Sequence, residues 1–163
     1  MSKPVILCVD DQRDVLAALL KDLEPLGDYF DMVDTESADE AMQVLEEFDA
    51  QGQPVALIIS DHVMPGGSGV EFLTAISKQK RFAHTRKLLL TGLATHDDTI
   101  RAINEAHIDG YITKPWEAAE LLAQIKQLVT QFIFDEFPDS YQQYQPVLDS
   151  DVMFERLQAG GGP

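Results

Sequence analysis

The chain has 163 residues, 45% of them hydrophobic, which suits one domain with a buried core and a short appendage. Its 28 acidic residues against 12 Lys and Arg give a formal net charge of −16, so direct nucleic-acid binding is not expected, because a phosphate backbone would be repelled. Acids at residues 10 and 11 come too early for a signal peptide and no apolar run is long enough to span a membrane, so we expect a cytoplasmic protein without membrane attachment.

Short apolar runs alternate with helical patterns along the chain. Strands are predicted at residues 5–9, 29–33, 55–60, 87–91 and 110–113. Helices are predicted from an apolar stripe at 15–23, a Ser37–Glu40 capping box, a cap at Ser68, a short pattern at 97–106 and a long one from Trp116. This strict alternation predicts an α/β fold, a doubly wound five-stranded parallel sheet with helices on both faces.

Polar residues stand where the predicted strands end. The first strand ends in Asp10 and Asp11, the third in Asp61, the fourth in Thr91, and the fifth runs into Lys114. In such sheets ligands bind outside the carboxyl ends of the strands, so these side chains are expected to meet. Three carboxylates would repel one another unless a cation such as Mg²⁺ joins them, and a lysine and a hydroxyl suit phosphoryl oxygens. The set predicts phosphoryl transfer to a carboxylate, although each residue alone is more typical of a helix cap or a solvated surface group.

Four motifs now identify a resemblance, "VDD" at 9–11, "SDHVMPGGSG" at 60–69, "LTG" at 90–92 and "YITKPW" at 111–116. In this order and spacing they resemble the receiver domain of two-component response regulators, over about residues 3–130. The resemblance implies a flavodoxin-like receiver fold and a role in phosphorelay signal transduction. Its chemistry would be limited to self-phosphorylation and self-dephosphorylation, so the chain is expected to be a switch and not an enzyme.

The resemblance also implies roles for single residues. Asp61 would accept a phosphoryl group from a phosphohistidine of a sensor histidine kinase or a phosphotransfer protein. Asp11, Asp61 and the backbone carbonyl of Val63 would bind Mg²⁺, with Asp10 acting largely through water. Lys114 and Thr91 would contact the phosphoryl oxygens.

The resemblance further implies how the state of the site is transmitted. Thr91 and Tyr111 would form the coupled switch pair, and the fourth helix, fifth strand and fifth helix would change affinity for an unknown downstream protein. The Lys114–Pro115 bond would be cis.

Val63 and Leu93 occupy positions that tune the lifetime of the acyl phosphate. Because both are apolar and cannot orient water, slow self-dephosphorylation is predicted. His62 is read as a residue at the rim of the cleft and not as a general base.

The domain organisation is predicted as a receiver over 1–130 and a C-terminal helical extension with an acidic tail over 131–163. The apolar stripe of the last helix continues past residue 130 and needs a cover. In one reading the segment from Val147 to Leu157 folds back over it. In the other the helix makes a homodimer contact or leads to an output module. The chain would then be a regulatory receiver fragment of a larger protein with an enzymatic output.

Two other functions fit the sequence less well than a receiver does. A Mg²⁺-dependent phosphohydrolase with an aspartyl-phosphate intermediate would need a D-x-D pattern after the first strand, and "VDDQRD" lacks it. A flavin binder would need a loop rich in Ser, Thr and Gly at the same place, where two acids stand.

Overall fold

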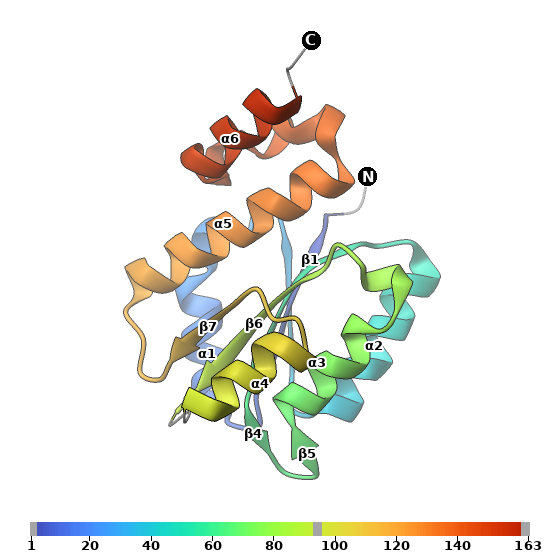
Figure 1. The fold of residues 1–163 in the computed structure, drawn as a ribbon, viewed down its shortest axis with the longest axis vertical. Coiled ribbons are helices and arrows are strands. Elements are labelled where there is room, and N and C mark those ends of the chain that lie inside the picture. The colour runs from blue at the N-terminus through green and yellow to red at the C-terminus, as the bar shows by residue number, and fades with distance from the viewer. Residues whose placement is uncertain (1–2, 93–95, 161–163) are drawn as a thin grey trace.

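The computed structural model describes residues 3–92 and 96–160, and its centre is a five-stranded parallel sheet in the order β2-β1-β3-β6-β7 (Figure 1). The strands are β1 Val5–Val9, β2 Asp31–Thr35, β3 Val55–Asp61, β6 Arg86–Thr91 and β7 Gly110–Thr113. β1 and β3 are buried along their whole length, because helices cover both faces of the sheet. The predicted doubly wound fold is confirmed.

Six α-helices occur in the described residues, with short 3-10 helices between some of them. They are α1 Arg13–Asp22, α2 Ala38–Gln51, α3 Gly69–Ser77, α4 His96–Glu105, α5 Ala118–Glu136 and α6 Ser150–Gly160, with η1 Glu24–Leu26, η2 Lys80–Phe82 and η3 Pro138–Val147. One apolar cluster joins the sheet to α1, α5 and η3, and a second joins its other face to α2 and α3. None of the helices in the described residues is long and apolar enough to cross a membrane.

Serine caps start α2 and α3 as the sequence predicts. The Oγ of Ser37 accepts a hydrogen bond from the Glu40 amide at 3.1 Å, and Ser68 does the same for Glu71. The Glu40 carboxylate accepts from the amide of Glu36, one residue before the cap. These bonds satisfy amides that have no partner within the helix, so both helix starts are fixed by local sequence.

Two elements start two residues later than predicted. The second strand begins at Asp31, because Phe30 ends the turn after η1 and packs with 1% exposure in the core. The last receiver helix begins at Ala118 and not at Trp116, because Glu117 has an extended backbone. The ring nitrogen of Trp116 instead donates to Asp22 at the end of α1, at 2.8 Å. The Lys114–Pro115 bond is cis, as predicted.

The C-terminal segment turns back onto the receiver core after α5. Tyr144, Val147 and Leu148 are buried in the same cluster as Phe30 and the inner face of α5. Tyr144 lies between aromatic rings, with centroids 5.9 Å from Phe30 and 6.5 Å from Phe137. The fold-back interpretation is therefore right for this part of the tail.

Only part of α6 helps to cover the apolar stripe of α5. Val152 and Met153 are partly buried, whereas Phe154 is 62% exposed and Leu157 39% exposed. For these last two residues the prediction of cover was wrong.

Candidate functional site

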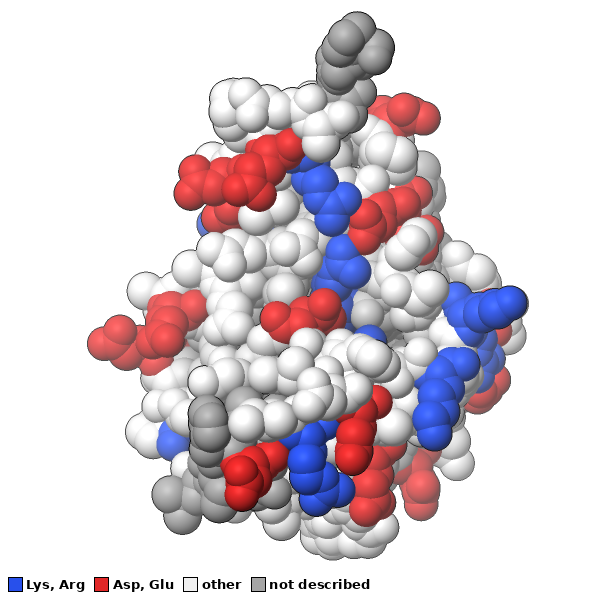
Figure 2. Space-filling view, in the orientation of Figure 1, with Lys and Arg blue, Asp and Glu red and all other residues white. Residues whose placement is uncertain are grey.

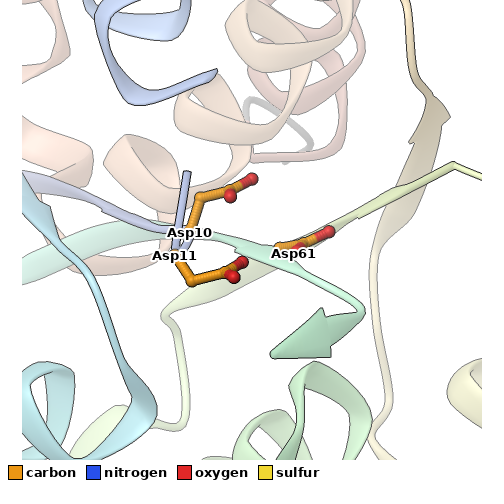
Figure 3. A group of neighbouring side chains, drawn as sticks. All are labelled: Asp10, Asp11 and Asp61. Carbon is orange, nitrogen blue, oxygen red and sulfur yellow. The ribbon is translucent and has the colours of Figure 1, made fainter. Parts of the chain in front are cut away.

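Three carboxylates meet at the carboxyl ends of β1 and β3. Asp10 and Asp11 follow β1, Asp61 is the last residue of β3, and oxygens from all three lie within 4.8 Å of one another (Figure 3). Asp10 is fully buried and Asp61 is 7% exposed, whereas Asp11 is open to solvent. The neighbouring parallel strands bring the acids together, as predicted.

Lys114 compensates part of this negative charge. Its Nζ lies 2.9 Å from Oδ2 of Asp10 and 2.9 Å from Oδ1 of Asp61. Burial raises the pKa of Asp61, and the nearby Asp10 raises it further, while the hydrogen bond from Lys114 acts in the opposite direction. Burial lowers the pKa of Lys114, but its hydrogen bonds to Asp61 and Asp10 outweigh this, and the net pKa is raised. The lysine is therefore held as a cation beside Asp61.

Asp10 differs from Asp11 and Asp61 in its surroundings. Oδ1 of Asp10 accepts the amide of Gln12 at 2.9 Å, so both of its oxygens have protein partners. Asp11 and Asp61 line an open cleft of about 420 Å³, which Asp10 does not line. Direct contact with a bound cation is thus easier for Asp11 and Asp61 than for Asp10.

Thr91 lies at the end of β6 and lines the same cleft as Asp61 and Lys114. Its hydroxyl is buried and has no hydrogen-bond partner among the described residues. A buried hydroxyl without a partner costs free energy, so a ligand oxygen in the cleft would supply what it lacks.

The chain leaves Asp61 through a tight hairpin that the sequence did not predict. β4 Val63–Met64 pairs with β5 Gly67–Ser68, and Gly66 between them has φ +85°, which favours glycine. The amide of His62 donates to Leu90, and its carbonyl accepts from Gly69 at 2.7 Å. The backbone beside Asp61 is therefore fixed, while the Val63 side chain is 75% exposed at the rim of the cleft.

The remaining predicted residues are placed as follows. His62 lines the cleft with its side chain partly buried, which fits a rim residue. Tyr111 is 46% exposed and pairs with Leu89 across β6 and β7. Leu93 lies outside the described residues. Gln12 and Gly92 also line the cleft and were missed, since only their position next to Asp11 and Thr91 could have indicated them.

The side chains fit a hard divalent cation. The possible ligands are all oxygens, they carry more negative charge than Lys114 neutralises, and the cleft leaves room for further ligands. Mg²⁺ is commonly held by one or two carboxylates together with phosphate oxygens, so this donor set suits it. Val63 also lines the cleft.

Comparison with known proteins identifies the family. The model for the response regulator receiver domain matches residues 6–126. The chain belongs to this family. This receiver is 35% identical over 124 residues to the hydrogenase transcriptional regulatory protein HoxA of Cupriavidus necator, covering 76% of the chain and 24% of HoxA. It is 32% identical to the phosphate regulon transcriptional regulatory protein PhoB of Escherichia coli, covering 76% of the chain and 51% of PhoB. The chain thus spans a quarter to a half of these curated relatives.

Solved structures agree with the family. The signal receiver domain of an HD domain-containing protein from Pseudomonas fluorescens is 31% identical, with a TM-score of 0.71, covering 83% of this chain and 93% of that one. A CheY-like receiver domain protein from Methanospirillum hungatei is 26% identical with a TM-score of 0.70, covering 82% and 99%. The receiver fold and the membership in two-component signalling are therefore shown.

Proposed function

We propose that this receiver accepts a phosphoryl group on Asp61 from a phosphohistidine of a sensor histidine kinase or a phosphotransfer protein. One observation carries the proposal. The Asp61 carboxylate borders an open cleft and lies 2.9 Å from the Lys114 ammonium, with two further carboxylates close by. A carboxylate held this way can act as a nucleophile, while a fixed cation meets the incoming charge.

In the proposed transfer an Asp61 oxygen attacks phosphorus and the bond from phosphorus to the histidine nitrogen breaks. The imidazole leaves with the electron pair and can take a proton from solvent. Lys114 would turn its ammonium to a phosphoryl oxygen. The Thr91 hydroxyl, which has no partner among the described residues, would donate to another. Bound Mg²⁺, held by Asp11, Asp61 and the Val63 carbonyl with Asp10 acting through water, would neutralise charge on the phosphoryl group.

The same proposal assigns the output to the α4–β7–α5 face. Ile100 and Ile103 on α4 are 42% and 48% exposed, and Tyr111 on β7 is 46% exposed. Movement of the Thr91 hydroxyl toward a phosphoryl oxygen would allow the Tyr111 ring to turn inward. That change would alter the affinity of this face for a downstream protein, and a few kcal/mol suffices to shift such a two-state population.

The receiver would serve a larger regulator. Its relatives extend well beyond the matched region, and one similar structure comes from an HD domain-containing protein. We therefore place the signalling unit at 1–130 and give 131–163 the role of a link to an output module. The receiver itself would turn over no external substrate and would work in the cytoplasm.

The test is intact-mass spectrometry after incubation with acetyl phosphate and Mg²⁺, beside an Asp61→Asn variant. One added phosphoryl group on the wild type alone, lost with a chelator, is the expected result. A matched Asp139→Asn variant, changed at an exposed acid far along the chain, should be phosphorylated like the wild type. An adduct on Asp61→Asn would contradict the proposal. A wild type that gains no phosphoryl group and also fails to bind beryllium fluoride, a phosphoryl mimic, would contradict it too.

A further inference from the structure

Helix α6 presents an apolar pair that no part of the described chain covers. Six large hydrophobic residues are exposed in the described residues, and four of them, Val63, Ile100, Ile103 and Tyr111, lie at the cleft or on the proposed output face. The other two are Phe154 and Leu157 of α6. Their spacing of three residues places them side by side on one face of the helix.

This helix is firmly held on the receiver. Nη1 of Arg156 donates to Asp135 of α5 at 2.8 Å. At the start of α6, the amide of Asp149 donates to Thr130 at 2.8 Å, and the Asp149 carboxylate caps the helix by accepting the Val152 amide. The exposed pair is therefore displayed on an ordered helix, which lowers the entropy cost of binding to it.

The charge around the pair is acidic. After residue 130 the chain has six acids and one base, and that base, Arg156, is paired with Asp135. Asp151 lies one turn before Phe154, and Glu155 follows Phe154 in the helix, both exposed. Figure 2 shows acidic side chains gathered along the part of the surface where Figure 1 places α6. A second copy of this face would bring like charges together, whereas a basic partner would be attracted.

We propose that Phe154 and Leu157 are the apolar anchors of a docking surface for a basic amphipathic helix of a partner protein. The partner's apolar stripe would cover the two side chains, and its Lys and Arg residues would lie over Asp151 and Glu155. The apolar pair supplies the shape of the contact, and the flanking acids set the sign of the partner's charge.

The position of α6 gives this contact a separate role from the phosphoryl site. Figure 1 shows α6 at one end of the molecule and the β4–β5 hairpin, which follows Asp61, at the other. We therefore expect binding at α6 to need no phosphorylation of Asp61, so that this contact would act as a permanent tether to the partner. The proposal stands without the proposed function of Asp61.

The test uses a fluorescein-labelled synthetic helix of 15 residues with Leu on one face and Lys on the other, and fluorescence anisotropy. Replacing both anchors, Phe154→Ala with Leu157→Ala, is expected to weaken binding at least about tenfold. The control, Gln142→Ala with Gln143→Ala, removes exposed side chains of η3, outside the proposed output face, and should change binding less than about twofold. Equal loss in both variants, or no loss in the α6 variant, would overturn the proposal.

Three further arms complete the experiment. Asp61→Asn should bind the peptide like the wild type, so a failure of the phosphoryl proposal leaves this result unaffected. A peptide with Glu in place of Lys should not bind, and binding of it would overturn the role of the acids. Sedimentation should show a monomer, since a dimer lost in the α6 variant would assign the surface to a second copy. If the double variant unfolds in urea more easily than the wild type, Phe154→Gln alone decides.

Discussion

A Cβ atom at Gly69 would lie 1.9 Å from the backbone carbonyl oxygen of Asp61. The same atom would lie 2.9 Å from the Ser60 hydroxyl, and the Gly69 amide already donates to His62 at 2.7 Å. The added Cβ would meet a backbone atom, so no side-chain rotation can relieve the contact. Glycine is therefore needed here for space, because only a residue without a side chain lets the start of α3 lie this close to the candidate acceptor.

We predict that Gly69→Ala destabilises the protein by about 3 kcal/mol, because the backbone at Asp61 or the start of α3 has to shift. Urea unfolding measures the loss. Gly67→Ala is the matched control in the same loop, since its added Cβ would meet only the Glu71 carboxylate at an ordinary 3.7 Å. Equal stability of the two variants would contradict the packing argument.

A second prediction concerns Tyr144, which fixes the tail to the core. Its ring is 8% exposed and packs between Phe30, Tyr29 and Phe137. Tyr144→Ala should cost about 3 kcal/mol in the free energy of unfolding, as for other large aromatic deletions in a core. Phe154→Ala, at a 62% exposed site, should cost less than about 0.5 kcal/mol.

The same urea experiment tests whether the tail unfolds with the receiver. Because Tyr144, Val147 and Leu148 share a cluster with Phe30, we expect one cooperative transition. A chain ending at Phe137, just after α5, should unfold at lower urea than the full chain, since it lacks this cover. Two separate transitions in the full chain, or equal stability of the shortened one, would show that the tail is an independent appendage.

Much of the candidate site follows from the sequence because parallel strands place their carboxyl ends at one edge. Asp11, Asp61 and Lys114 each follow a run of apolar residues, so the fold brings them together without any knowledge of long-range contacts. The helix starts at Ser37 and Ser68 were equally predictable, since capping depends only on neighbouring residues.

Other features depend on tertiary contacts and could not be read from local patterns. Tyr29 and Phe30 have high strand propensity, yet Phe30 packs under Tyr144 and the strand starts later. Phe154 fits an apolar helix stripe as well as Val152 does, yet Phe154 is exposed and Val152 is partly buried, a difference that depends on how α6 packs on the rest of the chain. The β4–β5 hairpin is too short to give a period-2 signal.

A third prediction concerns pH and the contact between α5 and α6. Burial raises the pKa of Asp135, but the hydrogen bond from Arg156 and the charge of Arg86 outweigh it, so the net pKa is lowered. A folded-state pKa below the unfolded value of about 4 stabilises the fold above that pH, and the gain is lost as pH falls through the folded pKa. Asp135→Asn should therefore cost about 1 kcal/mol near neutral pH and less at lower pH.

The measurement is urea unfolding of wild type and Asp135→Asn at pH 7, 5 and 3. The difference in unfolding free energy should shrink between pH 5 and 3. Asp139→Asn, at an exposed acid, is the control and should differ little from the wild type at every pH. A difference for Asp135→Asn that does not change with pH would show that the loss comes from packing and not from charge.

The last prediction rests on the proposed phosphorylation of Asp61. Val63 lies two residues after the acceptor, lines the cleft and is 75% exposed, so it can be replaced without loss of core packing. Its isopropyl group offers no hydrogen bond to a water molecule that would attack phosphorus. Val63→Asn adds a donor and an acceptor at this rim and should shorten the lifetime of the adduct by about tenfold, a smaller factor than the roughly 10²–10⁴ that a well-positioned general acid or base contributes. Val63→Ala stays apolar and should decay like the wild type, both followed by intact mass at timed intervals after removal of acetyl phosphate. Equal decay of the Asn and Ala variants would show that hydrolysis is limited elsewhere in the site.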